Sequence, residues 1–330
     1  MPATAAPQTK MKNETTNSHR PAPLWLVVAA FAAVYLIWGS TYLGIRYAVE
    51  SIPPFLMAGM RNLVAGLLLF GFARARDATA PSRIEWRDAA IAGGLMLFIG
   101  NGGVTWAEQM IPSSVSALLV ALTPVWMVVF DWLRPKGTRP GALVIAGLVV
   151  GFAGVAMLAR NNGHGAGAAY GWGVAALMAS SIGWSLGSIF NRSANKPASP
   201  FLAVAMQMIS GGALLLGAAV AGGELKEFSF AQVTWLSFGA WFYLMVAGSI
   251  VAYTAYVWLL HVSTPARVST NAYVNPLIAV LLGCTIGHEP FSHDVFVAGA
   301  MIIAAVVLVL RGGAQRKPEA KAPEACEEIA

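Results

Sequence analysis

The chain contains ten long apolar runs, and each is long enough to cross a membrane as a helix. A spanning helix needs about 20 mostly apolar residues, because the hydrocarbon core is about 30 Å thick and a helix rises about 1.5 Å per residue. The runs cover residues 24–46, 55–73, 88–108, 114–132, 140–159, 169–190, 200–221, 235–260, 266–286 and 294–311. Since strands of a membrane β-barrel would alternate apolar and polar residues, these runs predict an all-α integral membrane protein with ten transmembrane helices.

The composition excludes most other classes of protein. Of the 330 residues, 57% are hydrophobic and 11% are charged, whereas a soluble domain carries about 25% charged residues. So few charges cannot cover the surface of a soluble enzyme of this length, and a disordered chain would be far less apolar. The net charge of +6 does not indicate nucleic-acid binding, because the basic residues lie between the apolar runs.

The distribution of Lys and Arg predicts the orientation. With a cytoplasmic N-terminus, sixteen basic residues lie in cytoplasmic segments and three in external loops. Cytoplasmic loops of membrane proteins carry this excess, so we predict that both termini are cytoplasmic and that the protein is a multi-pass protein of the cell membrane. The tails are residues 1–23 and 311–330, and the second is rich in Ala, Pro and charge, which is typical of disorder.

The two halves of the chain resemble each other. Shifts of 146 and 152 residues place Trp38 on Trp184, Pro54 on Pro200, Pro124 on Pro276 and Gly147 on Gly299. The predicted repeats are residues 24–159 and 169–310, each with five helices. Because five is odd, the second repeat enters the membrane in the opposite orientation. Inverted repeats are typical of secondary transporters that work by alternating access.

Two symmetric prolines point to the membrane midplane. Pro124 and Pro276 lie about ten residues into the fourth and ninth runs. A proline inside a helix frees the carbonyl four residues earlier, and in lipid this group needs a partner or a wet cavity. We therefore predict helix kinks next to a site between the repeats, although each proline could also be a kink that only helps packing.

Polar and aromatic side chains recur at helical spacing within the runs, which suits a small amphipathic ligand. The predicted substrate cavity contains Trp38, Tyr42, Asn101, Thr105, Trp184, Ser188, Tyr253, Tyr256, Asn271 and Asn275. The amides could instead join helices by hydrogen bonds. Two charges complete the set. Arg61 lies well inside the second run, where it snorkels outward or binds either a substrate carboxylate or the carbonyl end of a helix. Glu108 is expected near the outer end of the third run as an exposed interfacial carboxylate.

Other signals argue against an enzyme. The sequence has no Walker A motif and no His-Glu-x-x-His zinc motif, and its two cysteines cannot form a cysteine metal site. We therefore expect no catalytic residues, no metal and no cofactor. The motifs Gly147-x-x-x-Gly151 and Gly183-x-x-x-Gly187 indicate close helix packing, which a homodimer could also use.

These residues resemble the EamA-type drug/metabolite transporters, and within them the larger ten-span exporters, over about residues 24–310. The matching pieces are Ile37-Trp38-Gly39-Ser40-Thr41-Tyr42, Pro54-Phe55 followed by Arg61, Gly100-Asn101-Gly102 with Ala107-Glu108, Ser116-Ala117-Leu118 through Thr123-Pro124, Tyr273-Val274-Asn275-Pro276 and His288-Glu289-Pro290-Phe291. The last piece departs from the family pattern at His288, where a Gly is usual.

The resemblance implies two five-helix domains around a central cavity, lined mainly by the first, third, fourth, sixth, eighth and ninth helices. It also implies export or exchange of small organic molecules. We therefore expect a secondary transporter that exports amino acids or amphipathic metabolites through the lipid bilayer. The alternatives are a flippase-like carrier of a lipid-linked precursor, which predicts a lateral opening between helices, and a membrane scaffold or receptor that transports nothing.

Overall fold

A computed structural model of the chain describes residues 23–76, 79–133, 139–160, 167–263, 270–289 and 292–314. The α-helices are α1 (Leu24–Ala48), α2 (Pro54–Arg76), α3 (Arg83–Gly93), α4 (Gly102–Ala107), α5 (Ser113–Val120), α6 (Thr123–Leu133), α7 (Ala142–Arg160), α8 (Gly167–Ser193), α9 (Pro200–Ala221), α10 (Glu224–Glu227), α11 (Trp235–Tyr243), α12 (Tyr253–Val262), α14 (Asn271–Thr285) and α15 (His293–Ala314). Two π-helices, η1 (Gly94–Asn101) and η3 (Leu244–Ala252), and a 3₁₀ turn, η2 (Phe230–Gln232), complete the described elements.

The described elements form eight helical segments that are long and apolar enough to cross a membrane, plus two shorter apolar helices at 142–158 and 271–285. The chain is therefore an all-helical membrane protein, as predicted. The predicted tails lie almost entirely outside the described residues.

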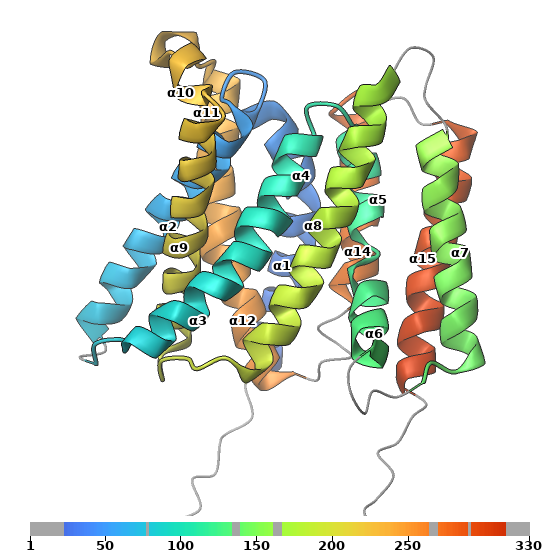
Figure 1. The fold of residues 1–330 in the computed structure, drawn as a ribbon, viewed down its shortest axis with the longest axis horizontal. Coiled ribbons are helices and arrows are strands. Elements are labelled where there is room, and N and C mark those ends of the chain that lie inside the picture. The colour runs from blue at the N-terminus through green and yellow to red at the C-terminus, as the bar shows by residue number, and fades with distance from the viewer. Residues whose placement is uncertain are drawn as a thin grey trace, which may run out of the picture.

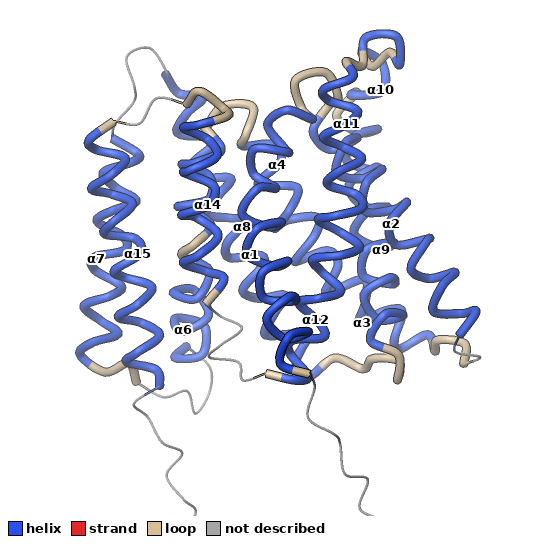
Figure 2. Tube along the Cα trace, turned by 180° about the vertical axis from the view of Figure 1, so that it is seen from behind, coloured by secondary structure: helices blue, strands red, loops and turns tan. Residues whose placement is uncertain are grey.

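The helices stand side by side in a bundle (Figures 1 and 2). The pair α2 and α9 lies at one edge, the pair α7 and α15 lies at the other, and the remaining spans stand between them. Each pair joins one helix from each half of the chain. The same is true of α1 with α14 and of α8 with η1, so the two halves interleave. We call the end of the bundle that carries α10 the α10 end and the opposite end the α3 end.

Two predicted spans contain a π-helix. The run 88–108 is made of α3, η1 and α4, and the run 235–260 is made of α11, η3 and α12. The two π-helices occupy equivalent places in the halves, because a shift of 152 residues carries η1 onto 246–253. π-helical segments are rare and often mark functional sites. Periodicity did not predict them, since a π turn changes the backbone hydrogen bonds without changing the apolar character of the run.

The two symmetric prolines act differently. The run 114–132 is two helices, α5 and α6, separated by a turn, and Pro124 lies in the first turn of α6, where its missing N–H costs little. The freed carbonyl of Val120 accepts a hydrogen bond from Thr123 Oγ1 at 2.7 Å. Pro276 instead lies within α14. The predicted kink at Pro124 is therefore a two-residue turn between α5 and α6, and the freed carbonyl has a side-chain partner.

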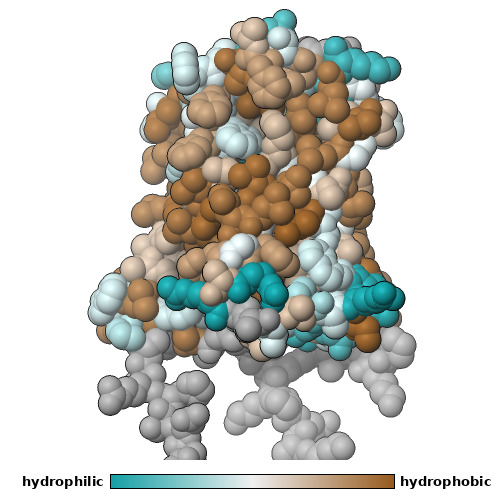
Figure 3. Space-filling model, turned by 90° about the vertical axis from the view of Figure 1, so that its left-hand side faces the viewer, coloured by the Kyte–Doolittle hydropathy of each residue, from teal (hydrophilic) through white to brown (hydrophobic). Residues whose placement is uncertain are grey.

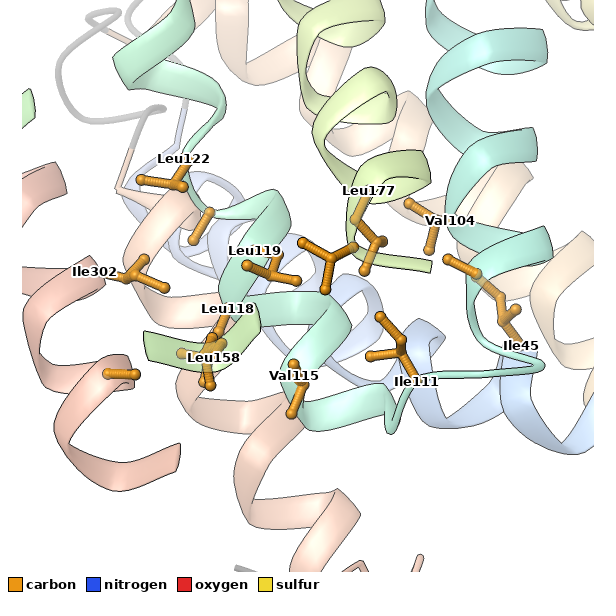
Figure 4. Packing of buried hydrophobic residues seen from close by; sticks show 14 of the residues in the cluster. Ile45, Val104, Ile111, Val115, Leu118, Leu119, Leu122, Leu158, Leu177 and Ile302 are labelled. Carbon is orange, nitrogen blue, oxygen red and sulfur yellow. The ribbon is translucent and has the colours of Figure 1, made fainter. Parts of the chain in front are cut away.

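The largest buried cluster surrounds α5. Leu118 and Leu119 lie at its centre, and Figure 4 shows Leu177 of α8 and Ile302 of α15 pointing into the same cluster. The side chains of Leu119, Leu177 and Ile302 are fully buried. Two helices of the second half thus close on α5 of the first half, which fixes the broken span in place.

The outer surface is suited to lipid. Figure 3, which views the edge formed by α2 and α9, shows a broad apolar belt with hydrophilic side chains gathered mainly at the α3 end.

The Gly-x-x-x-Gly motifs do not contribute to this surface. A Cβ on Gly147 would lie 2.9 Å from the carbonyl oxygen of Ala305, and one on Gly183 would lie 2.9 Å from that of Leu95. Both motifs therefore serve packing within the chain.

Candidate functional site

Two polar bridges join equivalent elements in the two halves. In the first half, Arg61 of α2 donates from Nη2 to Asn101 Oδ1 at 2.6 Å, and Asn101 is the last residue of η1. In the second half, the Tyr253 hydroxyl donates to Gln207 Oε1 at 3.3 Å, and Tyr253 directly follows η3. The shifts of the internal repeat carry Arg61 onto Gln207 and Asn101 onto Tyr253. In each half, a side-chain hydrogen bond therefore joins the second helix to the end of the π-helix.

Arg61 does not snorkel to a surface. The residue is only 5% exposed, and its Nε atom has no hydrogen-bond partner among the described residues. Its counterpart Gln207 is also buried and donates from Nε2 to Asn191 Oδ1 at 3.1 Å. The structure thus gives this position a polar partner in both halves, although only the first half has a charge there.

The predicted aromatic residues of α1 and α12 lie together. The ring centroid of Trp38 is 4.9 Å from that of Tyr256 and 6.2 Å from that of Tyr253. The Trp38 indole donates from Nε1 to the carbonyl of Gly248, in η3, at 3.3 Å. Trp184 packs against the same hydrophobic cluster as Trp38 and Tyr253, with its ring beside Gly100 of η1. Each repeated Trp therefore contacts the π-helix of the other half.

The other predicted cavity residues belong to α1, α4, α8 and α14. Thr105 is fully buried and donates from Oγ1 to the Asn101 carbonyl at 2.9 Å, so its hydroxyl is used within its own helix. Tyr42 of α1 and Ser188 of α8 are half-buried. Along α14, Asn271 is half-buried at the first turn, and Asn275 has a buried Oδ1 without a hydrogen-bond partner in the described part of the chain.

α1 and α14 approach closely at Gly39. A Cβ there would lie 2.7 Å from Ile278 and 3.2 Å from the Asn275 carbonyl oxygen. The ends of the same two helices are also joined, because the hydroxyls of Tyr35 and Thr270 are hydrogen-bonded. Asn275 is therefore held against α1 of the first half, as a residue between the repeats would be.

Glu108 is not the exposed interfacial carboxylate that the sequence predicts. It follows α4 at the α10 end and is only 5% exposed. Both carboxylate oxygens are buried, and neither has a hydrogen-bond partner among the described residues. Asn101, Thr105 and Glu108 recur at helical spacing in the sequence, but the burial of Glu108 depends on helices from elsewhere in the chain.

A second buried carboxylate, Glu289, joins three elements at the α10 end. It accepts hydrogen bonds from Ser113 N at 2.8 Å, Ser113 Oγ at 2.7 Å and Ser114 N at 3.0 Å, at the start of α5. Its Oε1 also lies 2.7 Å from Nη1 of Arg46, near the end of α1. Burial raises the pKa of the Glu289 carboxyl, but the hydrogen bonds from Ser114 and Ser113 outweigh it, so the pKa is below its usual range.

The residue before Glu289 explains the family pattern at this turn. His288 has φ 49°, in the left-handed region that favours glycine. Glycine is therefore the natural residue at this position, and His288 adopts the same backbone at some conformational cost. The sequence contained this signal, because the resemblance showed His288 standing where a Gly is usual.

A cavity of about 530 Å³ opens at the α10 end. Its lining includes Trp106, two residues before Glu108, Gln109, the residue after it, and Glu224 of α10. Glu224 accepts hydrogen bonds from the backbone of Phe55 at 3.2 Å and of Leu56 at 2.8 Å, and so caps α2.

One pentapeptide in α8 has the Gly-x-Ser-x-Gly spacing of a hydrolase nucleophile. Its serine, Ser185, lies inside a continuous helix and donates from Oγ to the Thr123 carbonyl at 2.9 Å and to that of Ser181 at 2.7 Å. A nucleophile of that class sits on a sharp turn between a strand and a helix. Ser185 therefore joins helices, and the described residues also contain no group of three His, Cys, Asp or Glu that could hold a metal.

Comparison with known proteins identifies the family of the chain and several relatives. The model of the EamA-like transporter family matches residues 24–160 and 171–311. The uncharacterized inner membrane transporter YedA of Escherichia coli K12 is 38% identical over 284 residues, which cover 86% of this chain and 90% of YedA. Protein PecM of Dickeya dadantii is 23% identical and covers 83% of this chain and 88% of its own.

A solved crystal structure shares the fold, with a TM-score of 0.58 and 20% identity, and the match covers 86% of this chain and 97% of the other.

Proposed function

Because this chain belongs to the EamA-like transporter family, we propose that it is a secondary transporter that exports small organic metabolites, amino acids or amphipathic compounds, across the inner membrane by alternating access. The observation that carries the proposal is the repeated bridge from the second helix of each half to the end of its π-helix, through Arg61 and Asn101 in one half and Gln207 and Tyr253 in the other.

We propose that the two halves are inverted five-helix repeats, and the excess of Lys and Arg in the predicted cytoplasmic segments supports both termini in the cytoplasm. α2 and α9 pair across the halves, as do α7 and α15. In an alternating-access transporter, matching parts of the two repeats face opposite sides of the membrane and exchange roles as the protein opens. Paired π-helices, each touched by the repeated Trp of the other half, provide matching elements of this kind.

We propose that substrate passes along the faces that carry Trp38, Tyr253 and Tyr256 on one side and Asn271 and Asn275 on the other. Aromatic rings contribute apolar contact area, and amides fix the orientation of a polar group. The unpartnered Oδ1 of Asn275 supports this role, because a buried amide oxygen without a donor is costly unless a ligand supplies one.

The test is a metabolite profile of medium and cells with and without overexpression, followed by flux of the identified compound in reconstituted liposomes. We expect one class of compound to accumulate outside the cells. Trp38→Ala and Asn271→Ala should reduce the flux at least tenfold, whereas Trp235→Ala, at a ring that is 89% exposed, should not.

The other functions give different outcomes. If the profile shows no exported compound, export is wrong. If a lipid-linked precursor changes leaflet instead, the protein is a flippase. If Trp38→Ala and Asn271→Ala leave every phenotype unchanged in a stably folded protein, it is a scaffold.

A further inference from the structure

Glu108 differs from the other buried or half-buried acids for which contacts are known. Asp88 accepts hydrogen bonds from the backbone and side chain of Asn195, both at 2.8 Å. Glu224 accepts two from the start of α2, and Glu289 has three donors and an ion pair. In the same protein, Glu108 has two buried oxygens and no donor among the described residues. Its environment is therefore not built to hold a permanent carboxylate ion.

The groups that face Glu108 come from three other elements. Arg61 of α2, Arg46 and Tyr42 of α1, and Glu289 after α14 all interact with it electrostatically. The backbone of Arg46 also faces the carboxylate but does not reach hydrogen-bonding geometry. Each arginine already has one partner, since Arg46 is paired with Glu289 and Arg61 donates from Nη2 to Asn101.

An ionised carboxylate without donors in a buried site would cost several kcal/mol, so this conformation favours the neutral acid. Both carboxylate oxygens of Glu108 are enclosed and the residue is only 5% exposed, so a proton fits at this carboxylate where a larger ligand would not. We propose that Glu108 is the proton-binding site of this transporter, and that it gains and loses a proton at a carboxylate oxygen during each transport cycle.

The surroundings of Glu108 provide a route for the proton and a side chain that responds when the proton leaves. The cavity of about 530 Å³ at the α10 end is lined by Trp106, two residues before Glu108, and by Gln109, the residue after it, so a movement of this turn toward the cavity would bring the carboxyl group to solvent. When the proton leaves, the new anion has an uncommitted donor in its surroundings, Nε of Arg61. Attraction of Arg61 toward Glu108 competes with its hydrogen bond to Asn101, at the end of η1.

Proton binding would thereby be linked to the π-helix of the first half. With Glu108 neutral, Arg61 holds Asn101, as in this structure. With Glu108 ionised, Arg61 shifts toward the carboxylate and releases η1. The second half has the equivalent bridge from Gln207 to Tyr253 but no charge there, so only the first half responds to the proton.

The first measurement needs no knowledge of the cargo. Infrared spectra of the purified protein are recorded during a pH titration, and the carbonyl stretch of protonated carboxyl groups is followed in the wild type, in Glu108→Gln and in Glu50→Gln. Glu50 is an exposed acid at the same end of the bundle. We expect one titrating component that is lost in Glu108→Gln and kept in Glu50→Gln. Identical spectra for the wild type and Glu108→Gln would overturn the proposal.

Stability provides a second measurement. Glutamine resembles the neutral acid, so Glu108→Gln should keep or raise the thermal unfolding temperature at neutral pH. A large decrease would mean that the site holds an ionised carboxylate, which contradicts the proposal. If Glu108→Gln cannot be purified, Glu108→Asp keeps the carboxyl group, and its band should shift in position or in titration midpoint. An unchanged spectrum would overturn the assignment.

This inference rests on the proposed function, because a coupling proton requires a cargo. The two can fail separately. A titrating Glu108 band without any exported compound would overturn export and support the proton site. With a cargo identified, a pH gradient across the liposome membrane should drive wild-type flux, and Glu108→Gln should lose this dependence while it still exchanges cargo without a gradient. Flux in Glu108→Gln that responds to the pH gradient as in the wild type would leave export standing and overturn the role of Glu108.

Discussion

Glu289 shows how one side chain can join three elements. Its carboxylate caps the start of α5, pairs with Arg46 of α1 and belongs to the turn that follows α14. The backbone N–H groups at the start of a helix otherwise lack partners, and the helix dipole favours a negative charge there. Because α5 and α1 belong to one half and the turn to the other, this residue holds the halves together at the α10 end.

The stability of the protein should therefore depend on the charge of Glu289. Its pKa is lowered by folding, so its contribution is complete above the usual carboxyl pKa of about 4.3 and is lost as the pH falls through the lower value of the folded state. Glu289→Gln should cost about 3 kcal/mol at neutral pH and flatten the decline of stability in acid. Thermal unfolding in detergent across pH measures both, with Glu50→Gln as the control. A Glu289→Gln profile that matches the wild type would contradict this role.

Single residues were predicted from the sequence where a pattern repeats. Trp38 and Trp184 were found from the internal repeat, and each does contact the other half. The burial of Glu108 was not predictable, because position along a helix does not tell which distant helices will cover it. The contact between Gln207 and Tyr253 could have been predicted, because the repeat aligns these residues with Arg61 and Asn101. It was missed because an uncharged amide in an apolar run gives a weak signal.

At the scale of elements, the close pairing of α2 and α9 depends on glycine. A Cβ on Gly66 would lie 2.9 Å from the backbone N of Ile209 and 2.9 Å from Met208 Cβ, whereas one on Gly71, in the same helix, would meet nothing within 4 Å. Small residues let membrane helices approach until their backbones touch. The contact is therefore local to one face of α2.

We expect opposite effects from the same substitution at these two positions. Gly66→Ala should force the helices apart and cost about 1–3 kcal/mol. Gly71→Ala should be neutral or stabilise by up to about 1 kcal/mol, because alanine is the better helix former. Unfolding temperatures of the two purified variants provide the comparison. Equal decreases in both would show that the cost is not caused by the contact with α9.

At the scale of the whole molecule, the membrane orientation can be tested. Single cysteines are placed at Ala80, between α2 and α3, and at Ser229, after α10, in a chain without Cys284 and Cys326. Both positions are exposed. The excess of basic residues predicts that Ser229→Cys reacts with a membrane-impermeant maleimide in intact cells and that Ala80→Cys reacts only after permeabilisation. The reverse pattern would mean that the termini are external.

The sequence by itself determined the class of the protein, the ten apolar segments and the internal repeat. These follow from local properties, because hydrocarbon thickness sets the length of a span and each run satisfies it alone. Tertiary structure decided where the spans break, how the halves interleave and which polar groups lose contact with water. Pro124 illustrates the difference, since the sequence predicts a kink with a freed carbonyl, whereas the structure has a turn between two helices there and Thr123 as the partner of the carbonyl. Glu108 shows it most clearly, because its burial without a donor comes from helices that are distant in sequence.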